Sequence, residues 1–241
     1  ISDCNVYKVL RCKTAEKLRA IIDNAIASIP QNNRVSDYDD WENGGYEPTP
    51  TIVQAAEALY ADQTVEEITR SGAGAEGIRN ATSAINEIVK DAQENHKKVI
   101  CFLTGVPGAG KTLVGLNLAI QRSDAAAGEH AVFLSGNFPL VTVLQEALAR
   151  DKVEQEKQAG RRLAKNDALR STSAFIQIIH KYRDSFVGND HVPPERVAIF
   201  DEAQRAWTQD KIAQFMQTKK GVANFEYSEP EFLISTMDRH Q

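Results

Sequence analysis

The sequence predicts an α/β fold in which a parallel sheet is flanked by helices, preceded by a small and mainly helical N-terminal segment. From residue 98 onward, short apolar runs bounded by glycine alternate with helical patterns, which is typical of strand–helix–strand units around a parallel sheet. Before residue 98, apolar residues recur at steps of three and four, as in amphipathic helices. With 42% hydrophobic and 25% charged residues among 241, the chain can form a core of ordinary size.

Three regions are expected along the chain. Residues 1–48 form a leading segment, with a strand at "NVYKVL", a helix that ends before Pro30, and an acidic, turn-rich linker. Residues 49–95 form two or three helices that lead into the main domain, and the pairs Thr51/Gln54 and Thr64/Glu67 have the spacing of capping boxes. Residues 96–241 form the α/β domain. The apolar stripe of the second region consists of Ile78, Ala81, Ile85, Ile88, Val89 and Ala92.

Within the third region, each element is predicted from its own pattern. Strands are expected at "VICFLTG", "AVFLSGN" and "RVAIFDEAQ", because each is a short apolar run bounded by turn residues. Helices are expected from Gly110, from Pro139 and near residues 171–187.

Composition limits the cellular setting. The N-terminus lacks the basic-then-apolar order of a signal peptide, and no apolar run is long enough to cross a membrane. The three cysteines Cys4, Cys12 and Cys101 form no C-x-x-C pair, so reduced thiols in a cytoplasmic protein without a membrane partner are expected. A net charge of −5 excludes a uniformly basic protein, but a local basic groove for nucleic acid stays possible.

A phosphate-binding loop stands between the first predicted strand and the helix that follows it. The motif G-x-x-x-x-G-K-[ST] is matched at every fixed position. Its glycines let backbone N–H groups surround the β-phosphate of a bound nucleotide at the positive end of the helix. Lys111 is expected to bridge the β- and γ-phosphates and Thr112 to bind Mg²⁺. The residues of this loop are Gly105, Val106, Pro107, Gly108, Ala109, Gly110, Lys111 and Thr112.

A second glycine pattern, "GAGAEG" at residues 72–77, matches the dinucleotide fingerprint G-x-G-x-x-G. It follows a helical pattern rather than a strand, and no strand–helix–strand unit surrounds it. A flexible loop is therefore the interpretation here.

An acidic motif, D-E-A-Q, ends the third predicted strand. Asp201 is expected to hold magnesium through water, and Glu202 to orient or deprotonate the attacking water. A hydrolytic glutamate would transfer the phosphoryl group of the nucleotide to water, which a small-molecule kinase must avoid, so the motif argues against such a kinase. Gln204 can report hydrolysis to a neighbouring site, which favours a helicase or translocase; a solvent-facing polar residue on the turn is the alternative.

Candidate nucleic-acid contacts lie in a locally basic stretch and at a strand end. Residues 151–183 carry eight basic and four acidic side chains, with His180 and Arg183 near hydroxyls and aromatic rings. Ser135 and Asn137 follow the second predicted strand, where a motor grips a nucleic-acid backbone. A solvated helix face and an ordinary turn are the alternative interpretations.

Taken together, several motifs resemble the Schlafen group 3-like DNA/RNA helicase domain family, a group of superfamily-1-like P-loop proteins. They are "GVPGAGKT", "FLSGNFPLV", "FIQIIHKYR", "IFDEAQRAW" and "SEPEFLISTMDRH", with "YEPTPTIVQAAEALY" as the lead-in, so the resemblance runs from about Trp41 to the end. It implies a RecA-like ATPase core, often joined to an upstream nuclease-like segment, of which residues 1–40 would be the tail.

The same resemblance implies a second RecA-like domain with an arginine finger, and a Gly-Gly-Gly-Gln-like motif, neither of which occurs in these 241 residues. We therefore expect a piece of a longer protein that binds ATP and Mg²⁺, hydrolyses ATP weakly by itself and does not unwind nucleic acid.

Two functions stay open on the sequence. The first is the ATP-hydrolysing first motor domain of a helicase or translocase, with single-stranded DNA or RNA as partner. The second is a P-loop ATPase that acts as a regulatory or defence-signalling module without translocation. Adenine recognition is also open, with Gln54 and Gln93 as candidates that can equally be surface helix residues.

Overall fold

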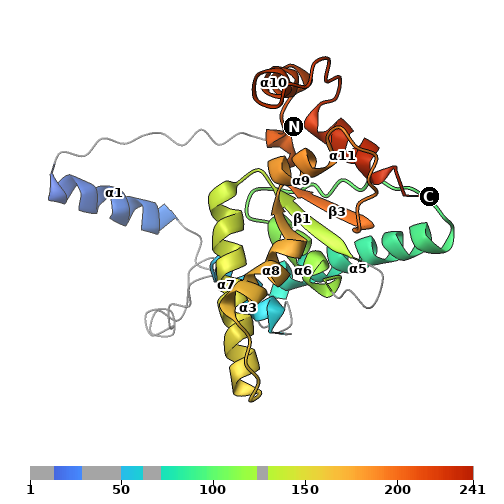
Figure 1. Cartoon of the computed structure of the whole chain (residues 1–241). Coiled ribbons are helices and arrows are strands. Elements are labelled where there is room, and N and C mark those ends of the chain that lie inside the picture. Colours follow the sequence, from blue (N-terminus) through green and yellow to red (C-terminus); the bar gives the residue numbers. More distant parts are fainter. Residues whose placement is uncertain (1–13, 29–49, 62–71, 124–129, 241) are drawn as a thin grey trace. The chain divides into compact units, whose positions relative to one another are not determined.

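The computed structural model describes residues 14–28, 50–61, 72–123 and 130–240 (Figure 1). The chain forms two compact units, residues 1–48 and 49–241. In the first unit the described part is the helix α1 (Ala15–Ser28), as predicted before Pro30. The strand predicted at "NVYKVL", the acidic linker and the Thr64/Glu67 capping box lie outside the described residues.

The second unit contains a three-stranded parallel sheet in the order β2-β1-β3. Its strands are β1 (Ala131–Ser135), β2 (Ile176–Ile178) and β3 (Val197–Asp201). Phe133 in the central strand pairs with Ile176 on one side and Ile199 on the other. Its helices are α3 (Ile52–Tyr60), α5 (Gly72–Glu94), α6 (Lys111–Gln121), α7 (Phe138–Gln158), α8 (Lys165–Phe175), α9 (Ile179–Phe186), α10 (Gln209–Phe215) and α11 (Glu229–Met237).

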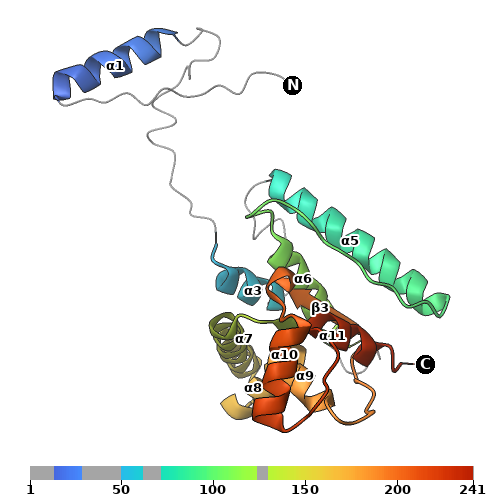
Figure 2. The same cartoon turned by 90° about the horizontal axis from the view of Figure 1, so that it is seen from above.

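Helices cover both faces of this sheet (Figures 1 and 2). Side chains alternate along a strand, and every residue of β1 is buried, so both of its faces belong to the core. Phe133 packs with α3, α6 and α7 on one face. Val132 and Leu134 pack with α9 and α11 on the other. The α/β class, with a parallel sheet flanked by helices, is confirmed.

Helix starts follow local chemistry. Thr51 and Gln54 form the predicted capping box of α3, so the Gln54 side chain is occupied there. The Asn137 side chain caps α7, with proline in the first turn. The helices predicted from Gly110 and Pro139 are therefore confirmed, with starts one residue away.

The loop predicted at residues 72–77 is wrong, because these residues form the first turns of α5. Ala75 and Ile78 are buried against Leu113, Val114 and Leu118 of α6, and this apolar contact offsets the cost of glycine in a helix. The predicted apolar stripe of α5 is buried at this end, whereas Ile88 is exposed.

The single helix predicted near residues 171–187 is also wrong, since α8, β2 and α9 replace it. Residues 176–178 pair with the edge of β1, and ladder hydrogen bonds together with burial outweigh helical periodicity here. Four apolar residues in this stretch are buried: Phe175, Ile176, Ile178 and Ile179.

The strand predicted at "VICFLTG" is absent, since residues 97–106 form neither a helix nor a strand. Both edges of β1 are taken by β2 and β3, and the described residues pair no further strand with β3. The Phe102 side chain is 85% exposed, and the neighbouring apolar residues Val99 and Ile100 are exposed as well.

Among residues 14–28, 50–61, 72–123 and 130–240, no helix has the length and apolar character needed to cross a bilayer.

Candidate functional site

The glycine-rich loop takes the backbone form that phosphate binding needs. Gly108 and Gly110 have φ values of +80° and +83°, a region that glycine enters without a steric penalty. Helix α6 begins directly after Gly110, and no described side chain caps it. Its first N–H groups therefore face the loop, where the helix dipole favours a phosphate.

Gly110 is fixed by packing as well as by its backbone angle. A Cβ at this position would lie 2.8 Å from Cδ1 of Ile78 in α5. Helix α5 therefore supports the phosphate-binding loop from outside.

Lys111 reaches back across the loop that precedes it. Its Nζ donates hydrogen bonds to the carbonyl oxygens of Gly105 at 2.8 Å and Val106 at 2.9 Å. The ammonium is therefore held at the loop mouth, where it can contact phosphate oxygens.

Thr112 joins the loop to the acidic motif. Its hydroxyl donates a 3.0 Å hydrogen bond to Oδ1 of Asp201 at the end of β3. Burial raises the pKa of Asp201 and the adjacent Glu202 carboxylate acts in the same direction, whereas the Thr112 hydrogen bond lowers it.

A magnesium ion fits this pair of side chains. Oδ2 of Asp201 is buried and has no hydrogen-bond partner within the described residues, which leaves an oxygen ready for a cation. The described residues contain no group of three or more His, Cys, Asp or Glu side chains that could hold a metal ion. A Mg²⁺ ion at Thr112 and Asp201 would be held by these two residues, nucleotide phosphates and water, which is the usual arrangement for this ion.

Glu202 follows Asp201 directly and has an unusual backbone conformation. Its φ of 56° and ψ of 37° are left-handed, which is uncommon for a residue with a side chain. The Glu202 carboxylate accepts a hydrogen bond of 2.5 Å from Nε2 of Gln204 and lies 3.4 Å from Nε of Arg205. The sequence motif contains both Glu202 and Gln204, but it did not predict the hydrogen bond between them.

A cavity of about 340 Å³ opens beside Glu202. It lies at the carboxyl ends of the strands, which is where ligands bind in open α/β sheets. Its wall combines aromatic rings with polar side chains: Gly136, Asn137, Phe138, Pro139, His180, Phe200, Glu202, Arg205, Ala206, Trp207 and Glu229.

The four residues predicted to contact nucleic acid differ in their exposure. Asn137 and His180 both line the cavity. Ser135 is fully buried, and its hydroxyl accepts a hydrogen bond from the Asn137 N–H. The Arg183 side chain is 1% exposed and lies between carboxylates, so its charge does not reach the surface.

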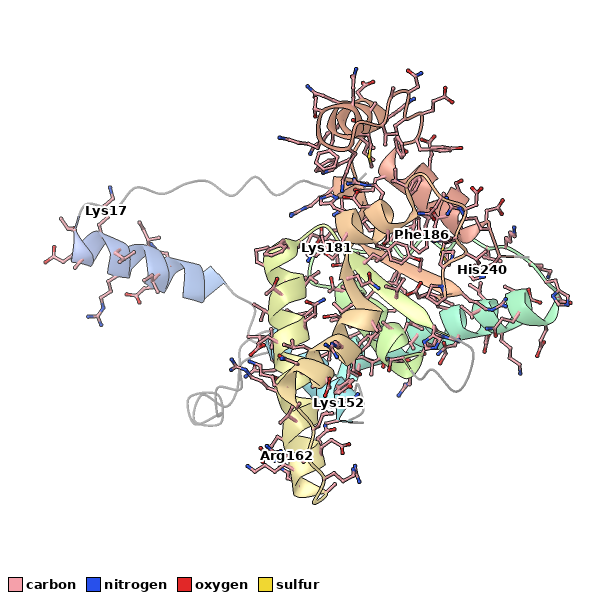
Figure 3. The ribbon with its side chains drawn as sticks, viewed as in Figure 1. Lys17, Lys152, Arg162, Lys181, Phe186 and His240 are labelled. Atoms are coloured by element: carbon pink, nitrogen blue, oxygen red, sulfur yellow. The ribbon has the colours of Figure 1, made fainter. Side chains whose placement is uncertain are left out.

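The predicted basic stretch does not form one patch. Arg161 pairs with Glu156, and Lys165 pairs with Glu146. Figure 3 shows Lys152 and Arg162 toward one end of the α7–α8 pair, well apart from Lys181. Its charges are thus partly neutralised and distributed over several helices.

Sequence reasoning missed two residues of this site, Trp207 and Glu229. Glu229 accepts hydrogen bonds from His180, Arg183 and the Trp207 N–H. The capping-box spacing of Ser228 and Glu231 signals the start of α11, but nothing in the local sequence shows which partners the Glu229 carboxylate meets.

Residues 98–241 match the family described as Schlafen group 3, DNA/RNA helicase domain. No curated protein and no solved structure matches the chain. The match covers more than half of the 241 residues and includes the phosphate-binding loop, the acidic motif and the cavity. The chain therefore belongs to the Schlafen group 3 DNA/RNA helicase domain family.

Proposed function

We propose that the chain is the ATP-binding and ATP-hydrolysing first motor domain of a superfamily-1-like DNA/RNA helicase or translocase, with a RecA-like core. The observation that carries this proposal is the 3.0 Å hydrogen bond between Thr112 and Asp201, beside Oδ2 of Asp201, which has no hydrogen-bond partner within the described part of the chain. It brings the phosphate-binding loop and the acidic motif, far apart in sequence, to one site.

Each side chain has a role that follows from its position. The loop N–H groups and Lys111 bind the phosphates of ATP, while Thr112 and Asp201 hold Mg²⁺. When bound, the ion neutralises charge on the β- and γ-phosphates. Glu202 orients or deprotonates the attacking water, and Gln204 sets the orientation of the Glu202 carboxylate through its hydrogen bond.

Single-stranded DNA or RNA is the proposed partner, bound beside the cavity. Asn137 and His180 offer polar groups there, and Phe138 is an exposed ring on which a base can stack. Because Ser135 and Arg183 are buried, the proposal rests on the other two residues. A second RecA-like domain is the proposed partner within the full-length protein, in the cytoplasm.

A regulatory or defence-signalling ATPase without translocation is the second candidate. Two observations favour it: the net charge is −5, and carboxylates pair with several side chains of the basic stretch.

The test is ATP hydrolysis by the full-length protein with and without single-stranded DNA and RNA. A motor hydrolyses ATP faster with nucleic acid, and the stimulation falls as salt rises because phosphate contacts release counterions. The Glu202→Gln variant is the control, and its rate should fall about 10²–10⁴-fold while ATP still binds. A rate that ignores both polymers would exclude the motor and favour the regulatory ATPase.

A further inference from the structure

Glu229, the first residue of α11, is a buried carboxylate with three donors around it. Its side chain is 1% exposed. Oε1 accepts hydrogen bonds from His180 Nδ1 at 2.9 Å and Arg183 Nη1 at 3.1 Å, and Oε2 accepts from the Trp207 N–H at 3.1 Å. A buried carboxylate needs such partners to offset the loss of its hydration.

Two of the hydrogen bonds of Glu229 hold the same peptide segment. Besides the carboxylate contact, the Glu229 N–H donates to the Trp207 carbonyl oxygen at 3.0 Å. Both main-chain polar groups of Trp207 are thus bound to one residue of α11.

The Trp207 ring is confined as firmly as its main chain. The His180 ring lies 4.4 Å from it, and Phe215 of α10 meets it edge-on at 5.4 Å. The Arg183 guanidinium and the Lys211 ammonium lie over the ring at 5.3 and 4.3 Å. This cage fixes Trp207 in position.

Trp207 ends the turn that carries the hydrolytic side chains. The turn begins at Asp201 on β3, passes through the left-handed Glu202 and the short 3-10 helix η3 (Ala203–Arg205), and reaches Trp207 two residues later. A left-handed residue with a side chain is strained and persists only where its surroundings hold it. The sheet holds one end of this turn and Glu229 holds the other.

We infer that Glu229 is a positioning residue for ATP hydrolysis, which sets the Glu202 carboxylate by fixing Trp207 at the far end of the turn. This inference rests on the proposed function, because it assigns Glu229 a part in the same reaction. It also connects the cavity wall to the reaction, since His180 lines the cavity and binds the same carboxylate.

The test compares two variants that disturb the same buried arginine. Asp184 binds Arg183 from the other side, through Nε at 3.1 Å and Nη2 at 2.9 Å, and the structure shows no contact between Asp184 and the turn within the described residues. Glu229→Gln removes an acceptor from the group that holds both Arg183 and Trp207. Asp184→Asn weakens the support of Arg183 and the ion pair between Asp184 and Lys220, but it leaves the hydrogen bonds between Glu229 and Trp207 in place, so it serves as the matched control.

The expected result separates kcat from binding. Glu229→Gln lowers kcat per folded molecule about 10- to 100-fold, because misplacing a catalytic group by about 1 Å costs up to this much, and leaves the Kd for ATP nearly unchanged. Asp184→Asn lowers the melting temperature but leaves kcat close to wild type. Equal kcat values in the two variants would overturn the inference. If Glu229→Gln fails to fold, Glu229→Asp, which keeps the charge but has a shorter reach, takes its place under the same criterion.

A second readout does not depend on hydrolysis. In a Trp41→Phe background, Trp207 is the one remaining tryptophan of the two in the sequence. Acrylamide should quench Trp207 emission more strongly in Glu229→Gln than in Asp184→Asn. A wild-type protein without ATPase activity would refute the proposed function. Equal quenching in Glu229→Gln and Asp184→Asn would instead show that Glu229 does not fix Trp207 in position.

Discussion

The Asp201 carboxylate is partly buried, and its Oδ2 has no hydrogen-bond partner among the residues that the structure describes. Burial raises its pKa above the usual 3.8, so in the folded chain the protonated form is favoured more than in the unfolded chain. Ionisation of Asp201 therefore lowers the free energy of unfolding as pH rises from 3.8 through the folded-state pKa. Without a cation, ionisation of this carboxyl is therefore less favourable in the folded chain than in the unfolded chain.

Asp201→Asn should therefore raise the melting temperature of the nucleotide-free protein at neutral pH. The gain should shrink as pH falls through the folded-state pKa, since wild-type Asp201 becomes neutral too. With Mg²⁺ and ATP at about 100 times the Kd, wild type should gain about 2.7 kcal/mol and the variant less. Thermal melts across pH, with and without Mg-ATP, measure both effects; a less stable variant at neutral pH without nucleotide would contradict the burial argument.

Residues of the phosphate-binding loop could be predicted from sequence because their geometry is local. Gly108 and Gly110 need φ values near +80°, and Lys111 follows them directly, so the motif contains the site. Glu229 and Arg183 could not be predicted in the same way. Their roles come from a hydrogen bond between residues 46 positions apart, which exists only after folding.

At the scale of elements, α5 supports the phosphate-binding loop through Ile78. Gly110→Ala should lower the free energy of unfolding for two reasons. The left-handed backbone costs about 1–2 kcal/mol once a side chain is present, and the clash with Ile78 adds to this loss. Gly108→Ala is the matched control: Gly108 has a similar positive φ, and no atom of the described residues beyond its chain neighbours lies within 4 Å of the added Cβ. Denaturant unfolding measures both.

Ile78→Ala completes this comparison. It removes the clashing side chain, so it should cost less stability in the Gly110→Ala background than in wild type, where Ile78 is buried. The same substitution should show no such coupling with Gly108→Ala. Additive effects in both backgrounds would show that α5 does not press on the loop.

Residues 99–104 are an apolar segment in water. Its large apolar side chains are between 39% and 85% exposed, whereas full burial of such a side chain from water stabilises a protein by about 1.5–3 kcal/mol. Cys101 lies within the segment and is exposed. With Cys4 and Cys12 replaced by serine, Cys101 should react with a thiol reagent at about the rate of an unstructured peptide. Slow labelling that becomes fast in denaturant would show instead that the segment joins the sheet, as its sequence pattern indicates.

Elements were predictable where one local signal dominates. β1, β3 and the starts of α3, α6 and α7 follow from apolar runs and capping residues. β2 was not predictable, because its three residues lie within a helical pattern and gain their hydrogen bonds from the edge of β1. The segment 99–104 shows the converse, since a strong strand pattern still needs an edge to pair with.

For the molecule as a whole, every residue of the candidate site lies in the unit 49–241. Deletion of residues 1–48 should therefore leave the Kd for ATP unchanged within about twofold, as expected for a site built inside one domain. Equilibrium binding of a fluorescent ATP analogue to both forms measures this. A large loss of affinity would show that the leading segment contributes to the site and that the proposed domain division is wrong.

The cavity beside Glu202 also bears on how the proposed ATPase activity could be blocked. Glu202 and Trp207 form part of its wall, whereas the phosphate-binding loop does not line it. A small molecule seated there would contact the turn that carries Glu202 and leave the proposed nucleotide site free. If the proposed activity holds, such an inhibitor would lower the maximal velocity without competing with ATP, so a high ATP concentration in a cell would not protect the protein from it.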